Sequence, residues 1–291
     1  MLDREYVYEC SAVDGQEKII EKSKRVIDTF RKNGQDIKGF VEPGASIDDM
    51  ANFLRRSHYM DDFLGASDDL RVAFYLYQGS GYKHINNFLR SNKGLDTTKK
   101  ETFSEIPSSA YDDFLETGEL RQYTFDMVKT IEALDLLIDK QEPLEEDAIL
   151  YHAGDINMVS EDGNIASMED LIAVNYSLAE PKFMQYGYLS TTLNISGRFC
   201  DEAPIIMAIR VPKGTKVLGP FNGEGEILLG RGYELNFIKS EIMDGKIFVY
   251  VDAVLKEKVN VRDEQDIEIT NEIDAIKEIL KDNEEKRGFT L

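Results

Sequence analysis

The sequence is poor in the residues that build metal and redox sites. It contains two cysteines, Cys10 and Cys200, and they follow no Cys-x-x-Cys spacing. Its three histidines, His58, His84 and His152, are widely separated along the chain. Zinc and redox centres need closely spaced ligands, so we expect no metal cofactor and two free thiols in a reducing compartment.

Long apolar runs and a basic leader are also missing. No stretch approaches the roughly 20 apolar residues that a membrane-spanning helix requires. Residues 1–18 have neither a basic start nor an apolar centre, so we expect no signal peptide. The predicted location is the cytoplasm, or a host cell reached by secretion or injection without the usual signal peptide.

Basic residues are outnumbered by acidic ones. The chain has 34 Lys and Arg against 55 Asp and Glu, a formal net charge of −21. Such a surface repels nucleic-acid phosphates and anionic lipid heads, which argues against direct nucleic-acid binding. A basic protein surface is a more plausible partner, although a need for solubility would explain the acidity equally well.

The first half of the chain has apolar residues at helical spacing. Gly34 follows the first of these stretches, where a helix would end. Because such stripes usually pack in a core, they indicate a helical lobe rather than a cofactor site. The predicted helices are residues 16–33, a short helix beginning near Ser46, and residues 70–77, 82–89 and 124–137.

Short apolar runs bounded by Gly, Pro and Asp replace this pattern after Pro143, and they are typical of strands. They lie at residues 148–151, 205–211, 216–218 and 246–255. The sequence therefore predicts an α+β protein with one domain over residues 1–261. A helical lobe is expected over residues 1–142 and a strand-rich lobe over residues 143–261. Residues 262–291 are charged and are expected to form a C-terminal helix or tail.

Three short segments of the strand-rich half carry residues suited to chemistry: LYHAG at 150–154, GYLSTT at 187–192 and EGEILL at 224–229. Each has an ordinary explanation when taken alone. A lone histidine after a strand is usually packed or solvated, and Ser-Thr-Thr is common at strand edges. Two glutamates around a glycine most often mark an exposed turn.

The order of these segments changes that interpretation. GYLSTTLN, IIMAIRVPKGTKV, EGEILLGRGYELNF and IFVYVDAVL follow one another and resemble the catalytic half of the ADP-ribosyltransferase superfamily. The chain is similar to the enzymatic chains of binary toxins, such as iota toxin and the vegetative insecticidal proteins. That family has an Arg on its first strand, then Ser-Thr-Ser, then Glu-x-Glu followed by Ile/Val-Leu-Leu. The resemblance covers residues 65–256.

The resemblance implies both a fold and an activity. The expected fold is a helical N-terminal lobe packed on a core of two mixed or antiparallel sheets. The expected activity is cleavage of NAD, which is a substrate here, and transfer of its ADP-ribose to a protein. A toxin, an effector or a phage-type modifier of a host protein would have this activity. Actin is a target by analogy only.

The helical half carries a further motif at residues 77–90, YQGSGYKHINNFLR. It is similar to the family pattern Tyr…Tyr-x-x-Ile-Asn-x-x-Leu-Arg, which lines the NAD cleft. The resemblance therefore assigns Tyr77, Tyr82 and Asn86 to NAD binding. Taken alone, the segment would be read as a helix with two packed tyrosines.

The resemblance also assigns the catalytic groups. Glu226 matches the family's invariant glutamate, which holds a ribose hydroxyl next to the bond that breaks. A carboxylate at this place stabilises the oxocarbenium-like charge, most strongly in a desolvated pocket. Ser190 is expected to orient Glu226 through a hydrogen bond. Thr192, where the family has Ser, is expected to support the strand from behind.

Recognition of the acceptor and of nicotinamide falls to other positions. Glu224 matches the residue that meets the nucleophile, and a glutamate there goes with arginine acceptors because a carboxylate can pair with a guanidinium. Phe199 stands near the place of the family's nicotinamide-facing Phe. The backbone at His152 and Ala153 is expected to hold the carboxamide.

His152 departs from the binary-toxin pattern, which has an arginine at this strand position. An arginine holds a diphosphate bidentately and a histidine cannot. The diphtheria-toxin and poly-ADP-ribose polymerase branch has a histidine there, which bonds the adenosine ribose. Two alternatives therefore stay open besides arginine transfer: an NAD glycohydrolase, and a binding module of the same fold without activity.

Overall fold

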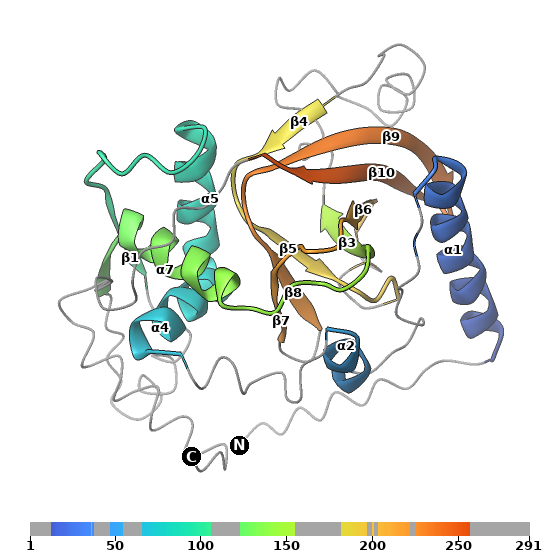
Figure 1. Cartoon of the computed structure of the whole chain (residues 1–291), viewed down its shortest axis with the longest axis horizontal. Helices are drawn as coiled ribbons and strands as arrows, with labels where there is room; N and C mark the ends of the chain where they lie inside the picture. The colour runs from blue at the N-terminus through green and yellow to red at the C-terminus, as the bar shows by residue number, and fades with distance from the viewer. Residues whose placement is uncertain are drawn as a thin grey trace. The chain divides into compact units, whose positions relative to one another are not determined.

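The computed structural model describes residues 13–35, 37, 47–54, 66–105, 123–154, 182–196, 200, 203–221 and 225–256. The chain forms two compact units (Figure 1). Of the described residues, those up to 54 and from 142 to 256 belong to the first unit, and those from 66 to 141 belong to the second.

The first unit is built on an eight-stranded mixed sheet in the order β4-β9-β10-β6-β3-β5-β8-β7 (Figure 1). Its strands are β3 (Ala148–Gly154), β4 (Lys182–Gln185), β5 (Leu189–Thr192), β6 (Ile205–Val211), β7 (Val217–Phe221), β8 (Glu226–Leu229), β9 (Tyr233–Met243) and β10 (Lys246–Leu255). The β10–β6 pair is parallel, and the other neighbouring pairs are antiparallel.

Both faces of this sheet are buried against apolar side chains. On β6, Ile205, Met207 and Ile209 belong to one core cluster, whereas Ile206 and Ala208 belong to another. Side chains alternate between the faces of a strand, so a strand covered on both faces is apolar throughout. This explains the continuous apolar run at residues 205–209.

Two helices of the first unit cover these clusters. Helix α1 (Val13–Lys32) packs on one cluster through Val26, Ile27 and Phe30. It ends before Gly34, whose φ of +83° is the left-handed conformation usual after a helix. Helix α2 (Ile47–Phe53) contacts β7, and Met50 of this helix and Leu54 just after it belong to the other cluster.

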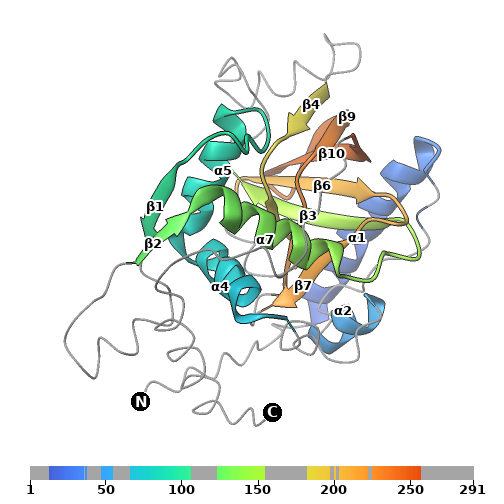
Figure 2. The ribbon, with the colours of Figure 1, turned by 60° about the vertical axis from the view of Figure 1, so that its left-hand side comes forward.

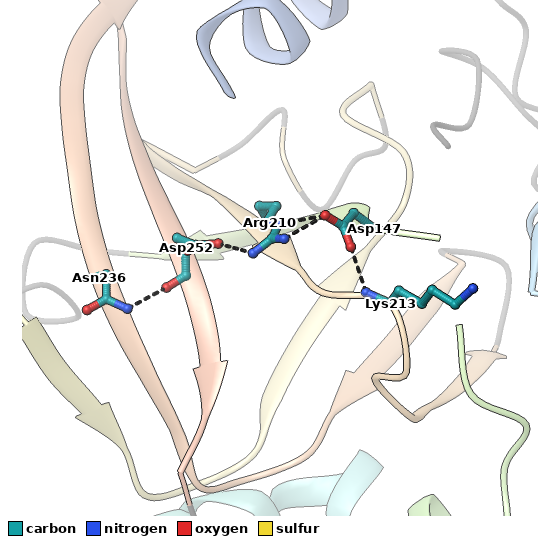
Figure 3. A network of polar contacts seen from close by, with 5 residues as sticks. All are labelled: Asp147, Arg210, Lys213, Asn236 and Asp252. Atoms are coloured by element: carbon teal, nitrogen blue, oxygen red, sulfur yellow. Dashed lines mark hydrogen bonds and ion pairs between the residues drawn. The ribbon is translucent and has the colours of Figure 1, made fainter. Parts of the chain in front are cut away.

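A polar network centred on Arg210 joins β6, β10 and the start of β3 (Figure 3). The guanidinium donates to Asp147 on one side and to Asp252 on the other, both at 2.6 Å. Asp147 also accepts the Lys213 backbone N–H, and the Asp252 carbonyl accepts from Asn236. Because Arg210 is partly buried, these paired carboxylates compensate its desolvation.

The second unit contains helices and a small antiparallel sheet. Its elements are α4 (Asp68–Leu76), the π-helical turn η1 (Tyr77–Gly81), α5 (Tyr82–Ser91), β1 (Thr102–Glu105), β2 (Tyr123–Asp126) and α7 (Met127–Asp139). Strands β1 and β2 pair with each other, and α4 lies beside α7 (Figure 2). Most of α7 is buried, in keeping with its apolar stripe.

The α+β class predicted from the sequence is confirmed, with one large mixed sheet and one small sheet in the described residues. The helices predicted at residues 16–33, 70–77 and 82–89 correspond to α1, α4 and α5. The short helix near Ser46 is α2, while Ser46 itself is outside the described residues. Residues 262–291, expected to form a helix or tail, also lie outside them.

The helix predicted at residues 124–137 begins later than expected, at Met127. Tyr123–Asp126 form strand β2 instead. Asp126 is extended, and its carboxylate accepts from the Lys129 backbone N–H at 3.0 Å. This N-cap satisfies a free amide of the first turn and fixes the start of α7.

Among the helices of the described residues, none is long and apolar enough to cross a membrane.

Candidate active site

Ser190 and Glu226 meet across neighbouring strands of the first unit. In the β5–β8 ladder Ser190 stands opposite Leu228, and Thr192 stands opposite Glu226. Ser190 and Glu226 are thus diagonal neighbours on one face of the pair. Ser190 Oγ donates a hydrogen bond to Glu226 Oε1. That bond holds the carboxylate in one orientation on rigid strands.

His152 bonds to the backbone of the same serine. It lies in β3 with 8% of its surface exposed, and its Nδ1 is 2.5 Å from the Ser190 carbonyl oxygen. A carbonyl can only accept a hydrogen bond, so Nδ1 carries a proton and donates. Ser190 therefore connects the two residues: its backbone carbonyl binds His152, and its hydroxyl binds Glu226.

The hydroxyl of Thr192 serves the turn that follows β5. Thr192 is buried, and its Oγ1 accepts from the Asn194 backbone N–H at 3.1 Å. The preceding residue, Thr191, donates from Oγ1 to the Ile227 carbonyl at 2.7 Å and so ties β5 to β8. Both threonines stabilise the strand pair that carries Ser190 and Glu226.

Gly225 precedes Glu226 in a left-handed conformation, with a φ of +64°. A Cβ atom at this position would lie 2.7 Å from Met50 Sδ. The backbone angle therefore favours glycine here, and an added Cβ would also make the flexible end of the Met50 side chain move. Gly225 is not among the residues predicted from the sequence, although a glycine between two candidate functional glutamates is itself a signal of a special backbone angle.

The second unit brings Tyr77, Tyr82 and Asn86 together. Asn86 Nδ2 donates to Tyr77 Oη at 3.3 Å, and the two tyrosine rings lie 6.3 Å apart between centroids. Tyr77 and Asn86 are buried, whereas Tyr82 is 42% exposed. The motif is thus a local cluster with one accessible aromatic ring.

The turn between the two tyrosines depends on its glycines. Gly79 has a non-helical ψ of −143°, which puts a kink inside η1. A Cβ on Gly81 would lie 2.5 Å from the Leu76 carbonyl oxygen. The segment QGSG therefore forms a glycine-dependent kink between α4 and α5.

The remaining predicted site residues are placed as follows. Ala153 follows His152 in β3 and pairs with Ile206 of β6. Glu224 and Phe199 lie outside the described residues.

Burial raises the pKa of Tyr151, which precedes His152, so this phenol stays neutral. In the described part of the chain, no three His, Cys, Asp or Glu side chains are grouped to hold a metal.

Comparison with known proteins gives the class of this enzyme. Residues 45–258 match the family model described as ADP-ribosyltransferase exoenzyme. The chain belongs to this family, as the motifs predicted. It is an NAD-dependent mono-ADP-ribosyltransferase, and NAD is its substrate. Toxin enzymes of this kind modify protein acceptors.

Solved structures of toxins have the same fold. C3stau2 from S. aureus, solved with NAD, is 18% identical over 75% of this chain and 100% of its own, with a TM-score of 0.54. The C3 exoenzyme of Clostridium limosum is 19% identical over 75% and 98%, with a TM-score of 0.51. BECa, the ADP-ribosylating toxin of a C. perfringens binary enterotoxin, solved with NADH, is 15% identical over 74% and 49%, with a TM-score of 0.51. No curated protein sequence matches the chain.

Proposed function

We propose that this enzyme transfers ADP-ribose from NAD to an arginine side chain of a host protein, as a toxin or effector. The observation that carries the proposal is the Ser190–Glu226 hydrogen bond on adjacent strands, directly after Gly225. This pairing supports a preorganised carboxylate within the Glu224-Gly225-Glu226 motif. The excess of acidic residues favours a basic acceptor surface.

Glu226 is proposed to drive the cleavage of NAD. Breaking the bond between nicotinamide and ribose leaves positive charge on the ribose ring, and nicotinamide departs with the bonding electrons. A carboxylate already oriented toward this charge stabilises the transition state without reorganisation. Ser190 would keep that orientation while the substrate binds.

Glu224 is proposed to receive the acceptor. An arginine guanidinium is planar and presents paired N–H donors that match a carboxylate. Glu224 would hold the guanidinium and take up the proton that it loses when a nitrogen attacks the ribose carbon. This role requires a carboxylate at position 224, two residues before Glu226.

The remaining predicted residues are proposed to bind NAD. Tyr77, Tyr82 and Asn86 form one cluster in the second unit, and the exposed ring of Tyr82 is suited to stacking on a flat heterocycle. Phe199 and the backbone of Ala153 are assigned to nicotinamide on the strength of the motif. Two of the structurally similar toxins were solved with NAD or NADH, which supports a nucleotide ligand.

The variant Glu224→Gln tests the acceptor assignment. We expect transfer to agmatine, a small arginine analogue, to fall by about 10²-fold or more, because the amide cannot take up a proton. Slow hydrolysis of NAD should persist, because Ser190 and Glu226 are unchanged. The measurement is nicotinamide release and ADP-ribosyl-agmatine formation, each followed by mass spectrometry.

Glu234→Gln provides a matched control, since it removes one carboxylate from β9, where Glu234 pairs with Lys256. It should leave both activities intact. Transfer to agmatine that survives in Glu224→Gln would contradict the acceptor assignment. Release of free ADP-ribose alone by the wild type, with agmatine present, would identify an NAD glycohydrolase instead.

A further inference from the structure

The junction between β3 and β5 is the point where the large sheet is least continuous. Strand β6 pairs with β3 along the whole of Ala148–Gly154. Strand β5, on the other side of β3, is joined to it at one register position, Tyr151 opposite Thr192. If this antiparallel ladder continued, residue 153 would lie opposite Ser190. The pairing of β3 with β5 ends before that position.

The side chain of His152 bridges the strands where the ladder stops. Its Nδ1 donates to the Ser190 carbonyl oxygen, a group that a regular ladder would pair with backbone. The Ser190 hydroxyl, on the same residue, donates to Glu226. A displacement of the Ser190 backbone would therefore carry its hydroxyl away from the Glu226 carboxylate.

We propose that His152 is a positioning residue for NAD cleavage. Its Nδ1–H fixes the backbone of Ser190, and Ser190 in turn fixes the carboxylate of Glu226. This inference rests on the proposed roles of Ser190 and Glu226. It gives His152 a function different from the one expected of a phosphate-binding arginine at this strand position, because the protonated nitrogen bonds to the protein itself.

The two ring nitrogens can be tested separately with amide side chains. An asparagine can place its Nδ2 donor close to the position of His Nδ1, whereas glutamine reaches toward the position of Nε2. His152→Asn therefore retains a donor for the Ser190 carbonyl, and His152→Gln does not. If His152 instead served NAD through Nε2, glutamine would be the better replacement.

We expect His152→Gln to lower kcat for nicotinamide release by about 10- to 100-fold, as when a supporting hydrogen bond to a catalytic group is lost. KM for NAD should change much less. His152→Asn should recover most of the lost kcat. If the role of His152 were purely structural, both variants would lose thermal stability, and their kcat values would be similar.

Thr130→Val is the matched control for a general loss of stability. It removes the hydrogen bond from a buried hydroxyl of α7 to the Asp126 carbonyl, and it leaves β3, β5 and β8 untouched. It should lower the unfolding midpoint and keep kcat near that of the wild type. Far-UV circular dichroism and the thermal midpoint establish that each variant is folded.

The inference is overturned if folded His152→Asn is as slow as Ser190→Ala, or if His152→Gln is the faster of the two His152 variants. A rise in KM alone, with kcat unchanged, also overturns it. Glu226→Gln, measured alongside, separates the two proposals. If it cleaves NAD at the wild-type rate, the assigned catalytic roles fail as well. If it is inactive while the two His152 variants behave alike, the inference about His152 fails alone.

Discussion

Gly225 sets the backbone direction immediately before the Glu226 carboxylate. Its φ of +64° is costly for a residue with a side chain, and a Cβ would approach Met50 Sδ at 2.7 Å. We expect Gly225→Ala to lower the free energy of unfolding by about 1–2 kcal/mol for the left-handed angle, plus a smaller cost for moving the flexible end of Met50. Urea denaturation followed by circular dichroism measures this change.

Gly214→Ala separates the two contributions. Gly214 also has a left-handed angle, with a φ of +89°, but a Cβ there would meet nothing within 4 Å. Its replacement should therefore cost about 1–2 kcal/mol, from the backbone angle alone. Equal destabilisation by the two variants would show that the contact with Met50 does not constrain Gly225.

Single residues could be proposed for chemistry from the sequence, but most of their neighbours in space could not. The motifs identified Ser190 and Glu226, and the hydrogen bond between them was expected from the family resemblance. The hydrogen bond from His152 to the Ser190 carbonyl could not be predicted from the sequence. Every residue has a backbone carbonyl, so no residue type marks this acceptor, which lies 38 residues away along the chain.

At the scale of elements, α1 is attached to the sheet through a shared carboxylate. Glu241 of β9 accepts from Arg25 of α1 at 2.7 Å and from Tyr250 of β10 at 2.6 Å, and Lys239 lies 3.3 Å away. Partial burial raises the pKa of Glu241, but hydrogen bonds from Tyr250 and Arg25 outweigh it, and the pKa falls below its ordinary value. Ionised Glu241 therefore stabilises the folded state.

This network predicts how stability responds to acid. Because the pKa of folded Glu241 is lowered, its contribution is present above the unfolded value of about 4.5 and is lost as the pH falls through the folded value. Wild type should be more stable than Glu241→Gln at neutral pH, and the difference should shrink below pH 4.5. Urea unfolding at a series of pH values tests this. A difference that stays constant down to pH 3 would contradict it.

Elements buried on both faces were the easiest to predict, and polar strands were the hardest. The apolar runs at 205–211 and 246–255 coincide with β6 and β10. Strand β9 was not among the predicted runs, because residues such as Glu234, Lys239 and Glu241 interrupt its apolar character. Its strand conformation comes from pairing with β10 and β4, which is a tertiary effect.

For the whole molecule, the amino-acid composition limits the classes of partner that can bind. Only the sequence motifs indicate the reaction, ADP-ribosyl transfer. The net charge of −21 disfavours nucleic acid and favours a basic acceptor surface, but many acidic proteins share this property. The family match over residues 45–258 establishes the activity. Arginine as the acceptor stays a prediction that depends on the proposed role of Glu224, and the acceptor protein does not follow from the fold.

The most direct test of the account is nicotinamide release by the full chain, compared between wild type and Glu226→Gln. The amide keeps the size of the side chain and loses the charge that is proposed to stabilise the ribosyl cation. We expect both hydrolysis and transfer to agmatine to fall by about 10²–10³-fold or more, with the unfolding midpoint preserved. Glu234→Gln should retain both activities. A Glu226→Gln enzyme that released nicotinamide within about threefold of the wild-type rate, a barrier difference of under 1 kcal/mol, would contradict the central role of Glu226.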